Sequence, residues 1–142
     1  MKVTEFAKME PPQKLRGAEL ERVNAVTNRI IGAAIEVHRI LGPGLLEALY
    51  DTALCIEFDE RRYSYARQVR VPAIYKGCSL GHYVVDFVVD DLVVVEIKSV
   101  STVLPIYQAQ LLTYLRLMAR PVGLLINFNS RLMKEGIRRV VL

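Results

Sequence analysis

Cysteine is scarce in this chain, and neither of its two cysteines has the neighbours that a metal or redox site requires. Cys55 stands among apolar residues of helical spacing, and Cys78 follows a glycine in a segment with loop composition. Neither forms a CxxC pair or lies near a group of histidines, which argues against a structural zinc site. Unpaired thiols are typical of a reducing compartment, so we expect a cytoplasmic protein.

Long hydrophobic runs are also absent. A membrane-spanning helix needs about 20 consecutive apolar residues, and charged residues interrupt the most apolar part of this chain. The first residues alternate in charge and lack the apolar core of a secretory signal. We therefore expect no membrane association. The interrupting residues are Asp86, Asp90, Asp91, Glu96 and Lys98.

The net charge of +4 on 142 residues is modest but unevenly distributed. The last twelve residues carry four Lys or Arg residues and a single acid, Glu135. A basic excess suits a phosphate-bearing partner, although many proteins have as much. The candidates for contact with a nucleic-acid backbone are Arg67, Arg70, Lys134, Arg138 and Arg139.

Hydrophobic spacing predicts a flexible segment over residues 1–18 and a single domain over residues 19–142. Apolar residues three and four apart predict helices, and β-branched or alternating runs predict strands. Pro72 indicates an edge position for the first strand. The predicted helices cover residues 20–41, 45–58 and 105–118; the predicted strands cover residues 68–75, 83–89, 93–100, 122–128 and 137–142, with a loop over 76–81.

The order of these elements predicts an α/β fold with one mixed sheet flanked by helices. The strands on either side of the last helix should run parallel to each other. The chain contains no internal repeat and no low-complexity segment.

Three charged residues stand inside the second and third predicted strands. Asp86 lies in VVDFVV, and Glu96 and Lys98 lie in VVVEIKSV. Side chains two residues apart on a strand share a face, so Glu96 and Lys98 point the same way. Alone, this pair is explained equally well by an exposed face of the sheet. The second acid on the neighbouring strand favours a functional site, because a carboxylate among β-branched residues is costly to bury.

The length of the connection between these strands decides whether the two acids meet. A two-residue turn at Asp90 and Asp91 would pair Asp86 with Val95 and place Asp86 on the face opposite to Glu96. A shift of one residue would bring Asp86 across from Glu96. A shared site therefore predicts an odd-length connection, such as residues 90–92, or a β-bulge.

Two carboxylates on one face form a natural site for Mg²⁺ or Mn²⁺, which prefer oxygen ligands. Lys98 would hold or help to deprotonate the attacking water. Glu47 offers a third acid at the start of the second helix, although a favourable contact with the helix dipole also explains it. Gln110 and Tyr114 share a helix face, and packing alone would explain this pair as well.

Together these motifs resemble the PD-(D/E)XK nuclease superfamily, and more closely its GxxExxY protein family. The GxxExxY motif reads GLLEALY over residues 44–50, and the resemblance extends from Ile30 to Val141. Each motif is loose, but five of them occur in the expected order. The other segments that carry the resemblance are IIGAAIEVHRILGP, DFVV around Asp86, the Glu96-Ile97-Lys98 triplet, QLLTY over residues 110–114 and the late LLINF.

The resemblance implies a restriction-endonuclease-like α-β-β-β-α-β core that acts on DNA. It implies that the side chains of Glu47, Asp86 and Glu96, with the backbone carbonyl of Ile97, hold Mg²⁺ or Mn²⁺. It also implies that Lys98 serves the water, while Gln110 and Tyr114 line the path of the DNA.

Some positions depart from the family pattern or lack a clear task there. Val85 precedes Asp86 where a proline is frequent, and Tyr107 stands where a histidine is favoured, so no role is assigned to Tyr107. His38 matches a residue that recurs in the family. A buried histidine that packs on a helix face is more common than a histidine that binds a metal, so His38 is assigned no metal-binding role.

Three functions are compatible with this pattern. The first is a metal-dependent nuclease that cuts DNA phosphodiesters, and the second is a non-cleaving module that keeps the nuclease fold and binds nucleic acid or protein. The third is a folded protein whose acids hold a structural metal. No second module for reading sequence is evident, so a recognition partner or self-association would supply specificity.

Overall fold

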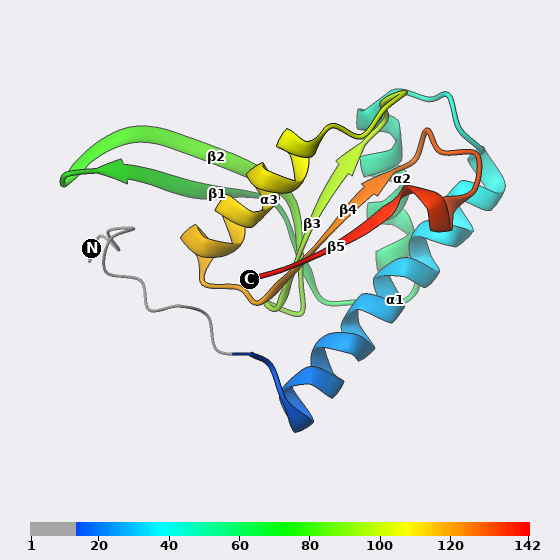
Figure 1. Cartoon of the computed structure of the whole chain (residues 1–142). Coiled ribbons are helices and arrows are strands. Elements are labelled where there is room, and N and C mark those ends of the chain that lie inside the picture. The colour runs from blue at the N-terminus through cyan, green and yellow to red at the C-terminus, as the bar shows by residue number, and fades with distance from the viewer. Residues whose placement is uncertain (1–13) are drawn as a thin grey trace.

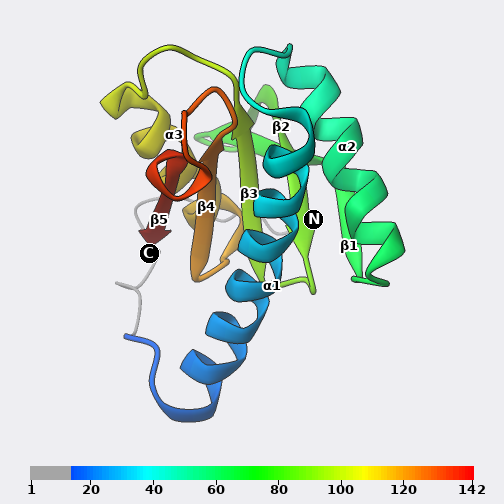
Figure 2. The ribbon, with the colours of Figure 1, turned by 90° about the vertical axis from the view of Figure 1, so that its right-hand side faces the viewer.

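A five-stranded mixed sheet with helices on both faces forms the frame of the computed structural model, which describes residues 14–142. Helices α1 and α2 cover one face of the sheet, and α3 lies on the other (Figures 1 and 2). The strands follow the order β1-β2-β3-β4-β5 across the sheet. The elements are α1 (Gly17–Leu41), α2 (Glu47–Glu60), β1 (Tyr65–Tyr75), β2 (Cys78–Val89), β3 (Val93–Lys98), α3 (Pro105–Met118), β4 (Val122–Asn127), the 3-10 helix η2 (Met133–Gly136) and β5 (Ile137–Val141).

This architecture confirms the predicted α/β fold. The α-β-β-β-α-β core runs from α2 through β1, β2 and β3 to α3 and β4, and α1 precedes this core in the chain. β3 and β4 are parallel, as predicted, and the other neighbouring strands are antiparallel. β1 occupies one edge of the sheet, the position that Pro72 indicated.

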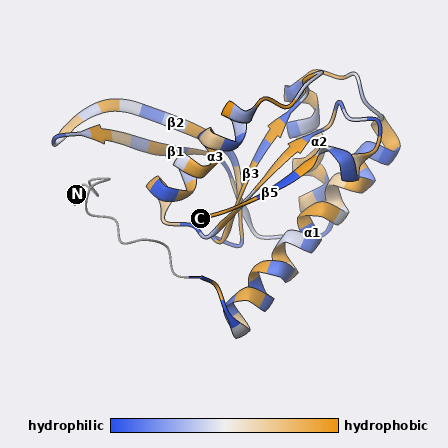
Figure 3. Cartoon of the chain, in the orientation of Figure 1, coloured by the Kyte–Doolittle hydropathy of each residue, from blue (hydrophilic) through white to orange (hydrophobic). Residues whose placement is uncertain are grey.

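The two faces of the sheet bury separate apolar cores. One core packs α1 and α2 against the sheet, and the other packs α3 against it. All six residues of β4 are buried, which explains why its sequence is apolar up to Asn127 (Figure 3). The buried Asn127 side chain hydrogen-bonds the backbone of Val100. The central strands therefore have little room for polar side chains, and those that they carry stand out.

The long helix α1 begins at Gly17, three residues before the start predicted from hydrophobic spacing at residue 20. Most of the segment predicted to be flexible, residues 1–13, lies outside the described residues. No helix within residues 14–142 combines the length and apolar character that a membrane crossing requires.

The first two strands are longer than predicted. Residues 76–81 were expected to form a loop, but only Lys76 and Gly77 form the turn, and β2 begins at Cys78. Both turn residues have positive φ values, 47° and 79°, which suits a two-residue hairpin turn. The polar, glycine-containing sequence CSLG has loop composition, but its pairing with β1 holds it in the strand.

Candidate active site

The register of β2 and β3 brings the two strand acids to the same place. Val89 pairs with Val93 and Phe87 with Val95, so residues 90–92 form a three-residue connection. The same register places Asp86 across from Glu96. This confirms the predicted odd-length connection. Asp90 and Asp91 both have φ values near +52°, a conformation that Asp tolerates better than most residues.

The two acids interlock through the backbone of the opposite strand. The Asp86 N–H donates to Glu96 Oε1 at 3.1 Å, and the Ile97 N–H donates to Asp86 Oδ2 at 2.7 Å. Regular pairing between β2 and β3 stops at Phe87 and Val95, immediately before these residues. Carboxylate oxygens thus take over as partners of backbone N–H groups, and this fixes the orientation of both side chains.

Burial and mutual repulsion make this carboxylate pair hard to ionise. Burial, followed by the negative charge of Asp86, raises the pKa of Glu96 to about 8. Burial also raises the pKa of Asp86 to about 6, and the charges of Asp51 and Glu47 add to the effect. No ion pair within residues 14–142 includes either carboxylate. Within the described residues the pair therefore has no cation in direct ion-pair contact.

Lys98 lies on β3 two residues beyond Glu96, at the same site. Its positive charge lowers the pKa of both carboxyl groups, though by less than burial raises it. The ammonium Nζ lies 4.7 Å from the centre of the Tyr107 ring, in the first turn of α3. This distance is typical of a cation–π contact, so the ring of Tyr107 holds the amine near the acids without neutralising it.

Glu47 lies at the first position of α2, where its side chain is exposed. Its charge contributes to the raised pKa of both Asp86 and Glu96, which places it near the pair. However, no three Asp, Glu, His or Cys side chains in residues 14–142 are arranged as a ready metal site. The structure thus brings Asp86 and Glu96 into contact and leaves Glu47 at the border of the site.

The glycine and tyrosine of the GLLEALY segment build the frame that presents Glu47. Gly44 has a φ of +102°, which favours glycine. The Tyr50 hydroxyl donates to the carbonyl of Gly42 and accepts from the Leu45 N–H at 3.2 Å. The Tyr50 ring stacks on Phe128 at 4.6 Å. These contacts fix the loop before α2 and therefore the start of that helix.

The two predicted substrate-binding residues of α3 have different surroundings. Gln110 is exposed, whereas Tyr114 is mostly buried. Burial, followed by the charge of Glu96, raises the pKa of the Tyr114 phenol, which places it close to the acids. Its ring contacts that of Tyr83 on β2 at 5.1 Å. Tyr114 therefore forms one wall of the site, and Gln110 lies one helical turn away on the exposed surface.

Asp51 belongs to the surroundings of the site and was not predicted. It lies on α2 and is only 6% exposed. Arg67 Nε donates to its Oδ1 at 2.8 Å, and Gln68 Nε2 donates to its Oδ2 at 3.3 Å. Asp51 is four residues after Glu47, so it shares a helix face with that residue. This spacing was the available signal.

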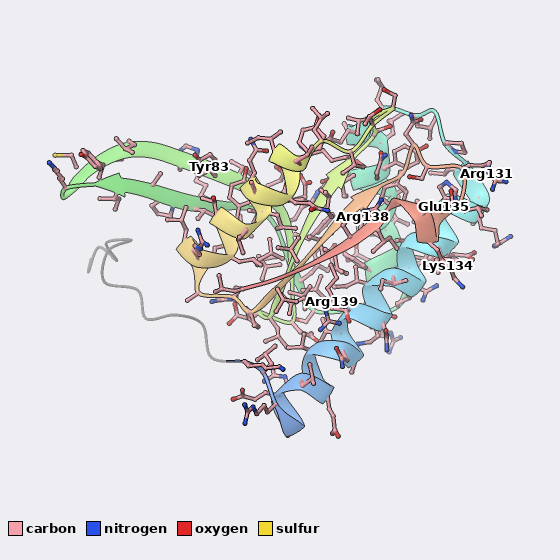
Figure 4. The ribbon with its side chains drawn as sticks, in the orientation of Figure 1. Tyr83, Arg131, Lys134, Glu135, Arg138 and Arg139 are labelled. Carbon is pink, nitrogen blue, oxygen red and sulfur yellow. The ribbon has the colours of Figure 1, made fainter. Side chains whose placement is uncertain are left out.

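His38 and the C-terminal cations lie outside the acid pair. His38 Nε2 lies 2.7 Å from the carbonyl oxygen of Ser130, a hydrogen bond that joins α1 to the turn after β4. The basic residues near the C-terminus do not form one patch. Arg131 and Lys134 lie beside Glu135 near the end of α1, whereas Arg138 and Arg139 are consecutive on β5 and point apart (Figure 4).

The donor set suits a hard divalent cation. Asp86 and Glu96 supply oxygen ligands that burial makes reluctant to ionise unless a positive charge compensates them. Mg²⁺ is commonly bound through one or two protein carboxylates, with water and substrate phosphate completing the shell. Two interlocked acids are therefore sufficient protein ligands for such an ion, even without a third acid in contact with them.

Comparison with known proteins agrees with this geometry. Residues 24–140 match the family model described as the PD-(D/E)XK nuclease superfamily. Searches of curated proteins and of solved structures returned no match. The matched region includes the interlocked acids, Lys98 and all of α3.

Proposed function

Because the chain belongs to the PD-(D/E)XK nuclease superfamily, we propose that it is a metal-dependent nuclease that hydrolyses DNA phosphodiester bonds. The observation that carries this proposal is the interlocked pair of Asp86 and Glu96, with Lys98 beside it. Partly buried acids that form no ion pair are expensive to maintain, and a catalytic cation explains why the central sheet contains them.

The proposed cation is Mg²⁺ or Mn²⁺. Asp86 and Glu96 would hold it directly, with the backbone carbonyl of Ile97 and the side chain of Glu47 as further ligands. A divalent cation bound there would polarise the phosphodiester and lower the pKa of a coordinated water. The exposed position of Glu47 leaves its side chain free to turn toward the pair.

The side chains around the proposed cation would act on the water, the phosphate and the DNA. Lys98 would orient the attacking water and stabilise charge on the phosphate, and the Tyr107 ring keeps its amine in place. Tyr114 borders the acids and Gln110 is exposed nearby, so both would line the path of the DNA. Each of these roles needs only the side chains already gathered around β3.

We also propose that the chain belongs to the GxxExxY branch of the superfamily. The frame formed by Gly44 and Tyr50 supports this assignment, because it gives each fixed letter of the motif a physical task. Glycine provides the positive φ, tyrosine ties the loop, and Glu47 is presented at the start of α2.

Cleavage assays test the proposal. Purified protein is incubated with plasmid, linear duplex and single-stranded DNA in Mg²⁺ or Mn²⁺, with EDTA as the metal-free control. We expect metal-dependent cleavage, and a loss of about 10²–10⁴-fold in the Lys98→Ala variant, the range typical for a group that transfers or positions a proton. The exposed Lys14 provides a matched control, since Lys14→Ala also removes one lysine charge but at a position far from Lys98 in the sequence.

Two results would overturn the proposal. One is an absence of cleavage by the wild-type protein in either metal, with DNA binding retained, which would favour a non-cleaving module. The other is equal cleavage by the wild type and a folded Lys98→Ala variant, which would indicate a contaminating nuclease. Circular dichroism of each variant checks that it is folded.

A further inference from the structure

β1 and β2 continue well beyond the rest of the sheet. They contain 11 and 12 residues, whereas β3 and β4 contain six each. From Val69 opposite Val85 to Tyr75 opposite Cys78, the two strands pair only with each other. We call this two-stranded segment, residues 69–85, the hairpin arm. It projects past α3 (Figure 1) and is roughly 25 Å long, given about 3.4 Å for each residue.

The arm begins at the candidate active site. Phe87 packs in the core under α1 and α2, but Val85, two residues earlier, packs in the core under α3. Residues two apart on a regular strand would share a face, so the ribbon changes face between them, at Asp86. On β1 the corresponding irregularity is Gln68, which has a φ of +52° and no partner in the pairing.

The arm, residues 69–85, carries two Lys or Arg residues, Arg70 and Lys76, and no Asp or Glu. Arg67, just before the arm, forms an ion pair with Asp51. Arg70 and Lys76 are exposed and make no ion pair within the described part of the chain. Two large apolar side chains are also exposed near the tip, Tyr75 at 60% and Leu80 at 69%.

One face of the arm packs on the protein and the other is free. Val71 and Val85 belong to the core under α3, and the Tyr83 ring contacts the Tyr114 ring. On the opposite face, the cross-strand neighbours Arg70 and Val84 are both exposed. The packed face holds the base of the arm against α3, and the free face is available to a partner.

We propose that the hairpin arm lies in a groove of double-stranded nucleic acid and so makes a duplex the substrate of this site. The proposal rests on the proposed nuclease function. The major groove of DNA is wide enough for a two-stranded β-ribbon, and phosphates on its rims would meet Arg70 and Lys76. An arm rooted at Asp86 would position the adjoining strand of the duplex over the acids.

Two features favour a duplex over other partners. Proteins that grip single strands stack successive bases on aromatic rings. The arm has two tyrosines, of which Tyr75 lies exposed at the tip and Tyr83 contacts Tyr114, so it offers no series of free rings for successive bases. Addition of a strand from a second copy at the β1 edge is hindered by Pro72, which has no N–H to donate, and by the irregular register between Ala73 and Ile74.

A binding measurement tests the arm independently of catalysis. All proteins carry Lys98→Ala so that DNA stays intact, and fluorescence anisotropy follows a 30-base-pair duplex and one of its single strands in Mg²⁺. Arg70→Ala with Lys76→Ala removes two charges from the arm. The matched control, Lys14→Ala with Arg22→Ala, removes two exposed charges at the start of α1, away from the arm (Figure 1).

We expect the arm variant to lose about tenfold in affinity for the duplex. The slope of log affinity against log salt should become shallower by about 2, since each phosphate contact contributes about 0.9. The control should change duplex affinity less than twofold, and single-strand affinity should change little in both. Equal losses in arm and control variants, or an equal loss for the single strand, would overturn the proposal.

A variant with a shortened arm tests whether the arm binds a second copy of the chain in place of a duplex. Residues 72–82 are replaced by Asn-Gly, and analytical ultracentrifugation follows the oligomeric state. We expect a folded protein with weakened duplex binding and an unchanged oligomeric state. A wild-type dimer that becomes monomeric on shortening, with duplex affinity intact, would show that the arm serves a second copy. Arm-dependent duplex binding without cleavage by the wild type would refute the nuclease proposal alone.

Discussion

At the scale of single residues, the chemistry of the site depends on two carboxyl groups that the fold makes difficult to ionise. Asp86 and Glu96 are fixed by backbone N–H groups and share a partly buried position. Their raised pKa values mean that the folded, metal-free protein holds protons that the unfolded chain has released.

This difference predicts a pH-dependent effect of Glu96→Gln. Because folding raises the pKa of Glu96, the wild type loses stability as pH rises from about 4.5 toward 8, whereas glutamine does not titrate. In EDTA we expect little difference at pH 4.5. At pH 8 the variant should be more stable by at least about 1 kcal/mol, the effect of a single pKa unit. Urea denaturation measures both values, and an equal difference at the two pH values would contradict the assignment.

The contact between Lys98 and Tyr107 gives a second prediction. A cation–π contact contributes about 0.5–2 kcal/mol, so Tyr107→Leu should lower kcat by up to about tenfold, with KM little changed. Tyr107→Phe keeps the ring and should stay within about threefold of the wild type. Steady-state kinetics and the pH profile of kcat measure these effects. Equal losses in the two variants would show that the hydroxyl, and not the ring, is what matters.

At the scale of elements, α2 and β1 meet next to the site through the ion pair between the buried Asp51 and the partly exposed Arg67. Removing Arg67 leaves Asp51, whose side chain is 8% exposed, without its guanidinium. We expect Arg67→Gln to lower the free energy of unfolding by about 1–3 kcal/mol, the cost of an unsatisfied buried polar group. Urea denaturation measures this change.

A second Arg–Asp pair provides the control for this prediction. Arg29 pairs with Asp90, whose side chain is 24% exposed, so water can replace the lost partner. We expect Arg29→Gln to destabilise the protein by less than about 1 kcal/mol. A larger loss for Arg29→Gln than for Arg67→Gln would contradict the account, because burial of the acid would not then set the cost.

The elements also show where sequence reasoning succeeds and where it stops. The parity of Asp86 and Glu96 correctly required a connection of odd length, because strand geometry allows only two faces. The outer end of β2 was missed, because residues 78–81 have loop composition and are held in the strand by pairing with β1. Cross-strand pairing is not encoded in local composition.

At the scale of the whole molecule, the order of elements and the mixed sheet followed from periodicity and from the parallel crossover around α3. The partners of individual side chains did not. The packing of Lys98 on Tyr107 and the burial of Asp51 depend on how α3 and α2 settle on the sheet. Without these contacts, the sequence does not distinguish Asp51, which is buried beside the site, from the other acids of the chain.

The whole molecule places the pair of Asp86 and Glu96 at the root of an arm that carries Arg70 and Lys76 and no acid. That arrangement suits an enzyme that holds a polyanion over a cation site, and both parts can be tested separately. The cation site is the more fundamental of the two, because hydrolysis and its metal dependence follow from it.

The most direct test is anomalous X-ray diffraction from crystals of the protein soaked in Mn²⁺. Our account predicts an anomalous peak between the carboxylates of Asp86 and Glu96, and its loss in the Asp86→Asn variant. Ordered carboxylates with no peak between them at saturating Mn²⁺, or a peak that persists unchanged in Asp86→Asn, would contradict it.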